Sequence, residues 1–304
     1  MALQVRTQFG DLYLADALPA IAEVFQNEYD QYNPVGPALF KMKGSNRSIE
    51  QTTGLTGFGR FVETPEGQPY NSDLAYQRFD KTFTHLKYTL GFKTTEELID
   101  DDEFGIVEGF SRELAKSAQD TREIHASSQF NEAFSATNFT GGDGLELCST
   151  VHPLVAGTEQ NELTTSADLS VTSLRQALQD IADTTNDRGL LINLRAKYLL
   201  VPNELEWDAI ELLKSNMRPD TTNNATNAFS SRNLEPMVWN YLTDADAWFL
   251  VCDKNQHDMT WWDRKPLTLY SEEYGSSGSM ATYAKMRYSF GWNDWRGIFG
   301  SPGA

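Results

Sequence analysis

The densest group of potentially reactive side chains in this 304-residue chain is acidic. Carboxylates occupy Glu96, Glu97 and residues 100–103. Because such oxygens are the ligands of Ca²⁺ and Mg²⁺, a cation site is one interpretation. The acids follow one another rather than taking chelating loop positions, which favours a second interpretation, stabilisation of a helix N-terminus by negative charge. A third interpretation is ion pairing with a second copy of the chain, through Arg60, Arg78 or Lys81.

Motifs for catalysis or cofactor binding are missing from the sequence. The histidines have no ligand spacing such as H-x-x-x-H; they are His85, His125, His152 and His257. The chain contains no G-x-S-x-G nucleophile elbow, no P-loop and no G-x-G-x-x-G turn. We therefore expect no catalytic residue, no metal site and no bound cofactor.

Tryptophans gather towards the C-terminus at Trp261, Trp262, Trp292 and Trp295. Such rings could stack on bases or sugars. No basic groove accompanies them in the sequence, so packing in the core or at a protein–protein contact is the favoured interpretation.

The charge balance restricts the partners of the chain. With 43 acidic and 25 basic residues, the formal net charge is −18. Because phosphate backbones are bound by Lys and Arg, this balance argues against a protein that grips nucleic acid through a basic face. It is compatible with a container for DNA, since a wall that repels its contents lets them move.

Cysteine content and the absence of leader signals point to an intracellular protein. Cys148 and Cys252 lie far apart in the sequence, and a reduced pair of small buried hydrophobic residues is the favoured interpretation. The N-terminal residues lack a basic start followed by an apolar core. No apolar run approaches the roughly 20 residues that a membrane helix needs.

The N-terminal third predicts an extended arm and a projecting ribbon. Residues 16–29 carry the apolar spacing of a short helix, which Asn33-Pro34 ends. Residues 44–71 are rich in Gly, Ser, Thr, Pro and Asn and contain few core residues. Gly57–Glu63 and Phe79–Lys93 are predicted to form the two strands of a long hairpin. A two-stranded ribbon is marginal alone, so it needs a surface to lie on.

A long helix is predicted next. Helical periodicity runs from about Asp100 to Phe134, a length on the order of 50 Å. Thr94 and Glu97 have the spacing of a capping box at its start. The apolar stripe is thin, so the helix must pack against a sheet or another molecule.

The remaining chain predicts an α/β core followed by antiparallel strands. Amphipathic helices are expected from Leu174 to Ala182 and from Asn203 to Leu213, with the strand Ala196–Val201 between them. Further strands are expected at 236–242, 247–253, 260–262 and 267–270. In the final strand, Ala281–Phe290, the alternation predicts that one face is buried.

Several segments resemble sequences of tailed-phage major capsid proteins, the shell subunits with the Hong Kong 97-like fold. They are GGDGLELCSTVHPLVAG at 141–157, LLINLRAKYLLVPNELEWDAIELLKS at 190–215, LTDADAWFLVCDKNQHD at 242–258 and RYSFGWNDWRGIFGSPGA at 287–304. The likeness spans most of residues 94–304 and is weaker before residue 90. The order of predicted elements also resembles that of the family.

The resemblance implies an α+β fold with an N-terminal arm, an extended β-hairpin loop, a peripheral domain with a long spine helix, and an axial α/β domain. The corresponding ranges are 1–43 for the arm, 44–93 for the extended loop, 94–160 and 258–292 for the peripheral domain, 161–257 for the axial domain and 293–304 for the C-terminal tail. Because many relatives begin with a charged helical scaffolding segment and the arm here begins almost at Met1, a separate scaffolding protein is expected.

The implied function is that of a major capsid subunit, which assembles as pentamers and hexamers into an icosahedral shell around the double-stranded DNA of a tailed phage. The expected location is the virion, after assembly in the bacterial cytoplasm. Expected partners are other copies, a scaffolding protein, a portal, a possible decoration protein and the packaged DNA, with no membrane. Candidate contacts between copies are Arg60, Arg78, Lys81, Glu97, Asp101, Asp102, Trp292 and Trp295.

Two alternatives remain at this point. An encapsulin-like protein nanocompartment would share the fold and enclose protein cargo instead of DNA. A soluble α/β hydrolase is a different class, and the missing catalytic motifs disfavour it.

Overall fold

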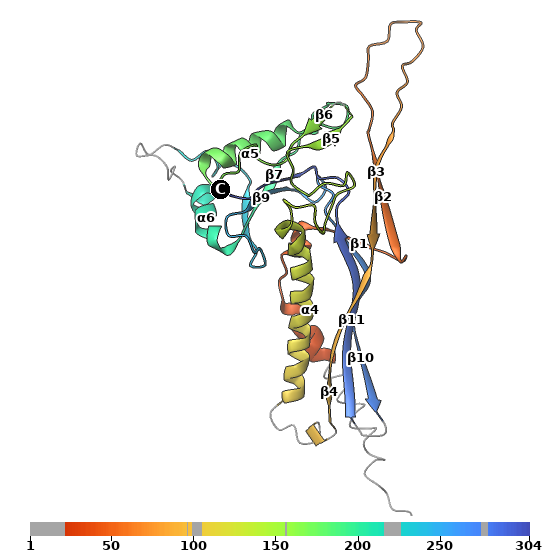
Figure 1. The fold of residues 1–304 in the computed structure, drawn as a ribbon, viewed down its shortest axis with the longest axis vertical. Helices are drawn as coiled ribbons and strands as arrows, with labels where there is room; N and C mark the ends of the chain where they lie inside the picture. The colour runs from red at the N-terminus through yellow and green to blue at the C-terminus, as the bar shows by residue number, and fades with distance from the viewer. Residues whose placement is uncertain (1–21, 96, 99–104, 156, 216–225, 275–278) are drawn as a thin grey trace, which may run out of the picture.

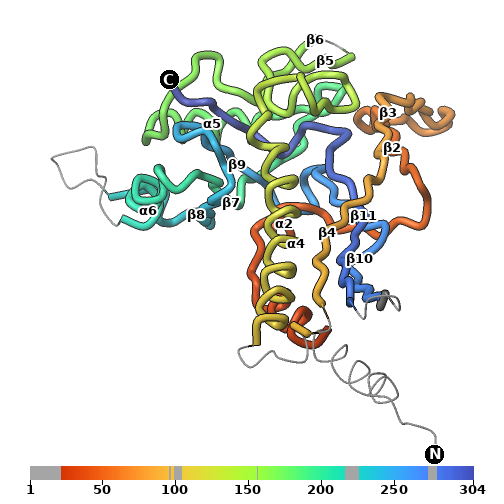
Figure 2. The backbone as a smooth tube through the Cα atoms, turned by 60° about the horizontal axis from the view of Figure 1, so that its bottom comes forward, coloured from red at the N-terminus to blue at the C-terminus, as the bar shows by residue number. Residues whose placement is uncertain are grey.

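The structure is a computed structural model that describes residues 22–304 except 96, 99–104, 156, 216–225 and 275–278. An elongated lower half, an α/β domain at one side of its upper end and a thin projecting ribbon make up the molecule (Figure 1). The backbone tube shows the same parts from another direction (Figure 2).

The lower half is a four-stranded sheet covered by one long helix. Its strand order is β1-β10-β11-β4, with β1 at Lys41–Gly44, β10 at Thr260–Tyr274, β11 at Ser279–Gly291 and β4 at Leu86–Thr94. β1 is parallel to β10, and the other pairs are antiparallel. Helix α4, Ile106–Asn131, runs beside this sheet (Figure 1). The sheet therefore joins segments from the first third and the last sixth of the chain.

The buried face of β11 is the one that the alternation predicted. Ala284, Met286 and Tyr288 are buried, whereas Lys285 between them is exposed. Met286 and Tyr288 share a hydrophobic cluster with Ala118 and Ala126 of α4. The narrow apolar stripe of α4 thus packs against a sheet, as the sequence predicted.

The α/β domain has a sheet with strand order β12-β9-β7-β8, which are Ile298–Ser301, Trp248–Cys252, Ala196–Val201 and Glu235–Val238. Helices α5, Val171–Asp183, and α6, Glu206–Lys214, share a hydrophobic cluster with Leu199, Val201 and Leu250. The intervening Leu200, Phe249 and Val251 belong to the cluster that includes α4. The sheet is therefore buried on both faces, between the helix pair and the long helix.

The ribbon pairs β2, Ile49–Leu55, with β3, Gln77–Thr84. Only His85 separates β3 from β4. The imidazole of His85 is buried and hydrogen-bonds to Ser289 through Nδ1 at 2.9 Å and to Ser45 through Nε2 at 3.1 Å. The ribbon is thus a direct extension of one strand of the lower sheet.

The remaining named elements are short. They are α2 at Gly36–Leu39, β5 at His152–Leu154, β6 at Gly157–Glu159 and the 3₁₀ turn η1 at Asn203–Leu205. Cys148 and Cys252 are both buried and free, which agrees with the favoured interpretation from the sequence.

Two expectations about the ribbon were wrong in detail. Its first strand is Ile49–Leu55, whereas Gly57–Glu63 is not a strand. The stretch Phe79–Lys93 is divided at His85, because its second half pairs with β11 instead of β2. A period of two residues identifies extended chain but does not reveal its partner.

The helix caps also differ from expectation. Helix α4 follows Gly105, which has a left-handed φ of 66° and no side-chain cap, while Thr94 ends β4. At α6 the N-cap position is Leu205, because a 3₁₀ turn takes up Asn203. The predicted strands 260–262 and 267–270 form one strand, β10. Its register shifts around Lys265 and Thr268, where Pro266 has no N–H to contribute to the ladder.

Candidate assembly interface

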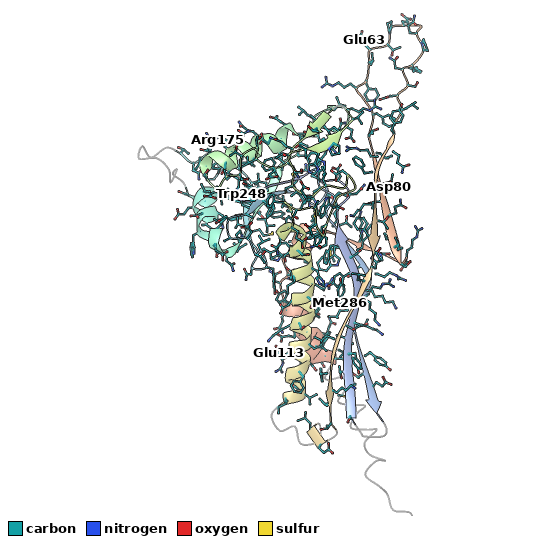
Figure 3. All side chains as sticks on the ribbon, in the orientation of Figure 1. Glu63, Asp80, Glu113, Arg175, Trp248 and Met286 are labelled. Carbon is teal, nitrogen blue, oxygen red and sulfur yellow. The ribbon has the colours of Figure 1, made fainter. Side chains whose placement is uncertain are left out.

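The outer half of the ribbon exposes large apolar side chains. From the end of β2 to the start of β3 these side chains are exposed: Leu55, Phe58, Phe61, Val62, Tyr70, Leu74 and Tyr76. Phe61 and Tyr70 have exposed fractions of 108% and 96%. Figure 3 shows this end, where Glu63 is labelled, standing clear of the rest of the molecule. A group of exposed aromatic rings is typical of a protein-binding surface.

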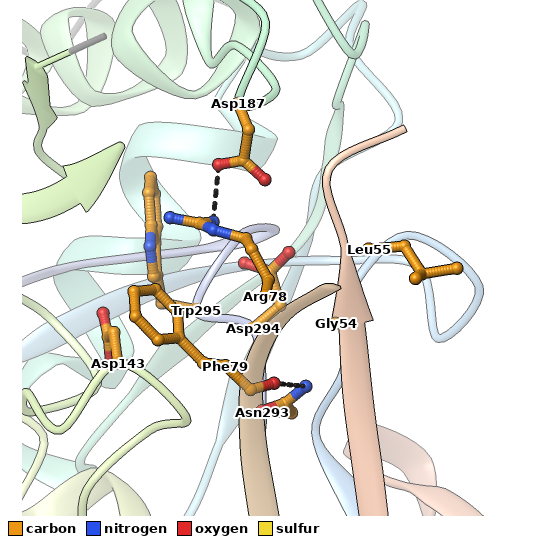
Figure 4. A pocket seen from close by; sticks show the side chains of 9 residues that line it. All are labelled: Gly54, Leu55, Arg78, Phe79, Asp143, Asp187, Asn293, Asp294 and Trp295. Atoms are coloured by element: carbon orange, nitrogen blue, oxygen red, sulfur yellow. Dashed lines mark hydrogen bonds and ion pairs between the residues drawn. The ribbon is translucent and has the colours of Figure 1, made fainter. Parts of the chain in front are cut away.

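The base of the ribbon is held by an ion-pair network. Arg78 on β3 contacts Asp187 with 2.6 Å between Nη1 and Oδ1, and it also donates to the carbonyl of Pro153. Arg296 approaches the same Oδ1 of Asp187 through Nη2 at 3.1 Å. Asp187 is buried, so both guanidinium groups satisfy a carboxylate that water barely reaches. Figure 4 shows Arg78 reaching from the ribbon to Asp187.

Two further contacts fix the ribbon base. Lys81 donates from Nζ to the carbonyl oxygen of Thr140 at 2.6 Å, and burial lowers the pKa of Lys81 while nearby Asp143 opposes that change. The Asn293 amide donates to the carbonyl oxygen of Phe79 at 3.3 Å (Figure 4). The pocket beside these residues has a volume of about 40 Å³, which is room for a few water molecules. The base of the ribbon is therefore packed closely against the body of the subunit.

Trp292 and Trp295 lie inside the chain. Their exposed fractions are 1% and 3%. The ring of Trp295 stacks on His152 with 4.3 Å between centroids. His152 in turn bonds Asp143 through Nδ1 at 2.7 Å and Asn161 through Nε2 at 3.0 Å. Both tryptophans therefore match the core-packing interpretation, and their rings are not on the surface that this subunit offers to another.

The other candidate contacts fall in different places. Arg60 is exposed in the outer part of the ribbon, and Glu97 is exposed just after β4. Asp101 and Asp102 lie outside the described residues. Arg78 and Lys81, which were expected to reach a neighbour, find their partners within the same chain. The six candidates that the structure describes therefore do not come together as one site.

A buried carboxylate joins the arm to the rest of the molecule, and sequence analysis missed it. Glu123 of α4 accepts hydrogen bonds from the backbone N–H of Gly36 at 3.1 Å and from Nε1 of Trp239 at 2.9 Å. A Cβ on Gly36 would lie 2.9 Å from Oε1 of Glu123, so this approach needs glycine. Burial raises the pKa of Glu123, while these hydrogen bonds oppose the change. The sequence offered one signal for this contact, which is a single acidic residue, Glu123, at a helix position that is buried.

Metal and membrane features can be assessed for the residues that the structure describes. Among them, no group of three or more His, Cys, Asp or Glu side chains is placed to hold a metal ion. No described helix is long and apolar enough to cross a membrane.

A sequence model of the phage capsid protein family matches residues 79–300, which is most of the chain. The chain belongs to this phage capsid protein family. The match begins within β3, includes α4 and every strand of the two four-stranded sheets except β1, and ends within β12. No curated protein matches the chain.

Solved structures show the fold of this capsid protein. A chain of Microbacterium phage Oxtober96 is 10% identical with a TM-score of 0.56, covering 89% of this chain and 91% of that chain. A chain from the capsid of a native GTA particle is 11% identical with a TM-score of 0.56, covering 88% and 90%. A chain from the procapsid of bacteriophage JBD30 is 13% identical with a TM-score of 0.52, covering 95% and 74%.

The expected identity and fold are confirmed. The protein is a structural subunit of a phage capsid, a major capsid protein of the tailed-phage type, and its α+β architecture is the Hong Kong 97-like fold. Such a subunit is part of the virion and associates with its own copies to form a shell.

Proposed function

We propose that copies of this capsid protein interlock through their ribbons and close, as pentamers and hexamers, into an icosahedral shell around double-stranded DNA. The observation that supports this most directly is the apolar outer half of the ribbon. Phe61 and Tyr70 touch almost nothing in their own chain. At roughly 25 cal/mol per Å² of apolar surface, covering several such rings supplies a substantial driving force for association.

The fixed base makes the ribbon suitable for this role. Arg78 and Lys81 bind the base to the body, and Arg188 adds an ion pair to Asp73 at 3.3 Å, so the part around Phe61 and Tyr70 is held away from its own chain. A projecting strand pair also leaves backbone edges unpaired, and a neighbouring subunit can cover them. The ribbon is thus held in its binding conformation before association, which limits the conformational entropy lost on binding.

We propose the domain division that the resemblance implied. The arm is 1–43, the extended loop is 44–93, the peripheral domain is 94–160 with 258–292, the axial domain is 161–257 and the tail is 293–304. The hydrogen-bonded order of the lower sheet supports a peripheral unit in which β10 and β11 pack on α4. β4 belongs to the same sheet, so the rigid unit begins within the range assigned to the loop.

Assembly takes place in the bacterial cytoplasm, with a separate scaffolding protein and a portal, and a decoration protein can be added to the finished shell. The formal charge of −18 supports packaging without tight binding, because an acidic wall repels phosphates and leaves DNA free to move. The proposed shell encloses its DNA without sequence-specific contacts.

The test is electron microscopy of the expressed protein, with the scaffolding protein if the chain alone does not assemble. Wild-type protein is expected to give closed shells. A variant with residues 58–74 replaced by a short Gly-Ser turn should fold but leave free subunits or isolated rings. The control is Val155→Ser, which removes an exposed apolar side chain outside the ribbon.

Two results would contradict the proposal. Shells of normal shape from the shortened variant would show that the ribbon does not hold subunits together. Protein cargo instead of DNA in particles taken from infected cells would rule out the proposed content.

A further inference from the structure

A large pocket lies in the α/β domain, away from the ribbon. Its volume is about 550 Å³, within the range of about 300–1,000 Å³ that is usual for ligand pockets. Its floor is apolar, formed by Leu178 and Ile181 of α5 with Leu194 and Leu234. Leu191 and Ile192, next to it in sequence, are exposed. The pocket can therefore bury a large apolar side chain.

The charge of this pocket is opposite to that of the whole chain. Its lining includes Arg195, Lys197 and Arg232 and contains no Asp or Glu. Lys197 is paired with Asp253 at 2.9 Å, whereas Arg195 and Arg232 are exposed at the rim. In a chain with 43 acidic and 25 basic residues, such a lining favours an acidic partner.

A complementary surface exists on helix α6 of the same domain. Trp207 in its first turn is 71% exposed, the most exposed tryptophan described. Glu211, four residues later, shares its helix face and is exposed, as are Asp208 beside it and Glu204 in the preceding 3₁₀ turn. An exposed tryptophan surrounded by acids is the shape and charge that the pocket would accept.

The two surfaces lie at opposite ends of β7. Residues 193–195 of the pocket precede β7, residues 196 and 197 begin it, and Trp207 follows its far end after the 3₁₀ turn. The six residues of β7 span about 20 Å. Figure 1 places α6 at the outer side of the domain, beyond β7. A subunit therefore cannot fill its own pocket with Trp207 unless α6 unfolds.

We propose that Trp207 of one subunit enters the pocket of the next, with the acids of α6 beside Arg195 and Arg232, and that this contact builds the ring. The inference rests on the proposed assembly into pentamers and hexamers and names the surfaces that form them. A contact between two different patches is head-to-tail, and it closes into a ring when the rotation between subunits allows. Charge complementarity identifies the occupant as a second copy of this chain.

A site-specific cross-link tests the contact directly. The photoreactive residue p-benzoylphenylalanine replaces Trp207, and shells or rings of the complete chain are irradiated. Mass spectrometry is expected to find α6 joined to peptides that contain residues 193–197 or 231–234. In mixtures of ¹⁴N- and ¹⁵N-labelled subunits, these products should combine the two labels. Cross-links to other surfaces, to a scaffolding protein or within one subunit would overturn the proposal.

Charge exchange provides a second test. Trp207→Ala should weaken ring formation by about thirtyfold, the loss typical of a central interface tryptophan. Arg232→Glu and Glu211→Arg should each weaken it, and the double variant should recover part of the loss. The matched control combines Arg232→Glu with Glu113→Arg on α4, whose side chain is 73% exposed, and should recover nothing. Equal recovery in both pairs would overturn the contact.

The failures of the two proposals can be told apart. If Trp207→Ala assembles like the wild type while shortening the ribbon blocks closure, this inference fails and the proposed function stands. If wild-type subunits form rings with the expected cross-link but never close into shells, the proposed function fails and the contact stands.

Discussion

At the residue scale, the polar groups buried in this capsid protein mostly join segments that are distant in the sequence. Glu123 connects the arm to Trp239, and Asp187 connects the ribbon to Arg296. His257 accepts a hydrogen bond on Nδ1 from the N–H of Met259 at 3.1 Å and has an exposed fraction of 3%. Burial, with help from Lys41, lowers the pKa of His257 to about 4.

His257 should make the protein sensitive to mild acid. The unfolded chain binds a proton near pH 6.5 and the folded chain only near pH 4, so stability is present above pH 6.5 and lost as pH falls towards 4. Between pH 7.5 and 5 this group accounts for about 2 kcal/mol of the free energy of unfolding. His257→Gln should flatten the pH dependence by that amount, as measured by urea unfolding.

The lowered pKa values of His85 and His125 act in the same direction, so the comparison must be with wild-type protein over the same pH range. His125→Gln is the comparison variant. Burial also lowers the pKa of this histidine, so this variant should flatten the pH dependence as well, but by less than His257→Gln does. If His257→Gln keeps the full wild-type slope, the folded chain does not hold His257 neutral.

At the element scale, α4 lies close to its neighbours because small residues line its contact face. Ala115 and Ala126 are completely buried. A Cβ built on Gly36 of α2 would lie 3.4 Å from the Cβ of Ala126, so α2 and α4 approach each other closely at these two small residues. The position of the helix therefore depends on small side chains as much as on its apolar stripe.

Replacing Ala126 with leucine should overfill this contact. The expected loss is about 1–3 kcal/mol in the free energy of unfolding, because neighbouring groups must move to admit the added carbons. Lys116→Leu adds an apolar side chain to an exposed position of the same helix and should change stability little. Denaturant unfolding measures both. A loss that is equal in the two variants would show that the contact is not tight.

Sequence patterns predicted the elements whose signals are local. The amphipathic helix α5, the strand Ala196–Val201 and the buried face of β11 all follow from periodicity within about ten residues. The partner of β4 did not, because β11 lies almost 200 positions away in the sequence. For the same reason Arg78 was expected to pair with a neighbouring subunit: Asp187 is its partner only in the folded chain. The exposure of Phe61 and Tyr70 also needed the structure.

At the scale of the whole molecule, Asp187 is the point where the ribbon, the α/β domain and the C-terminal segment meet. Its carboxylate faces both Arg78 and Arg296. Replacing a buried acid shared by two cations is costly, because the change removes an opposite charge from two guanidinium groups that are themselves largely buried. Asp187 is therefore the charged centre of the contacts that orient the ribbon relative to the body, beside the hydrogen bonds of Lys81 and Asn293.

Asp187→Asn should loosen this joint. We expect a loss of about 3 kcal/mol in the free energy of unfolding and faster proteolysis of the ribbon within residues 55–76. Asp183→Asn, an exposed acid of the same domain, is the control and should change neither. Thermal unfolding and limited proteolysis measure the two effects. Wild-type proteolysis of the ribbon in Asp187→Asn would mean that the other base contacts suffice.

The single residue between β3 and β4 has a mechanical consequence. A pull on the ribbon passes through His85 directly into β4, along the strand axis. Nine registered residue pairs join β4 to β11, from Thr94 and Met280 to Leu86 and Tyr288. Because the strands lie side by side along the direction of force, these pairs are strained in shear together instead of being unzipped one after another. The ribbon is thus a tether whose breaking strength depends on the full length of that strand pairing.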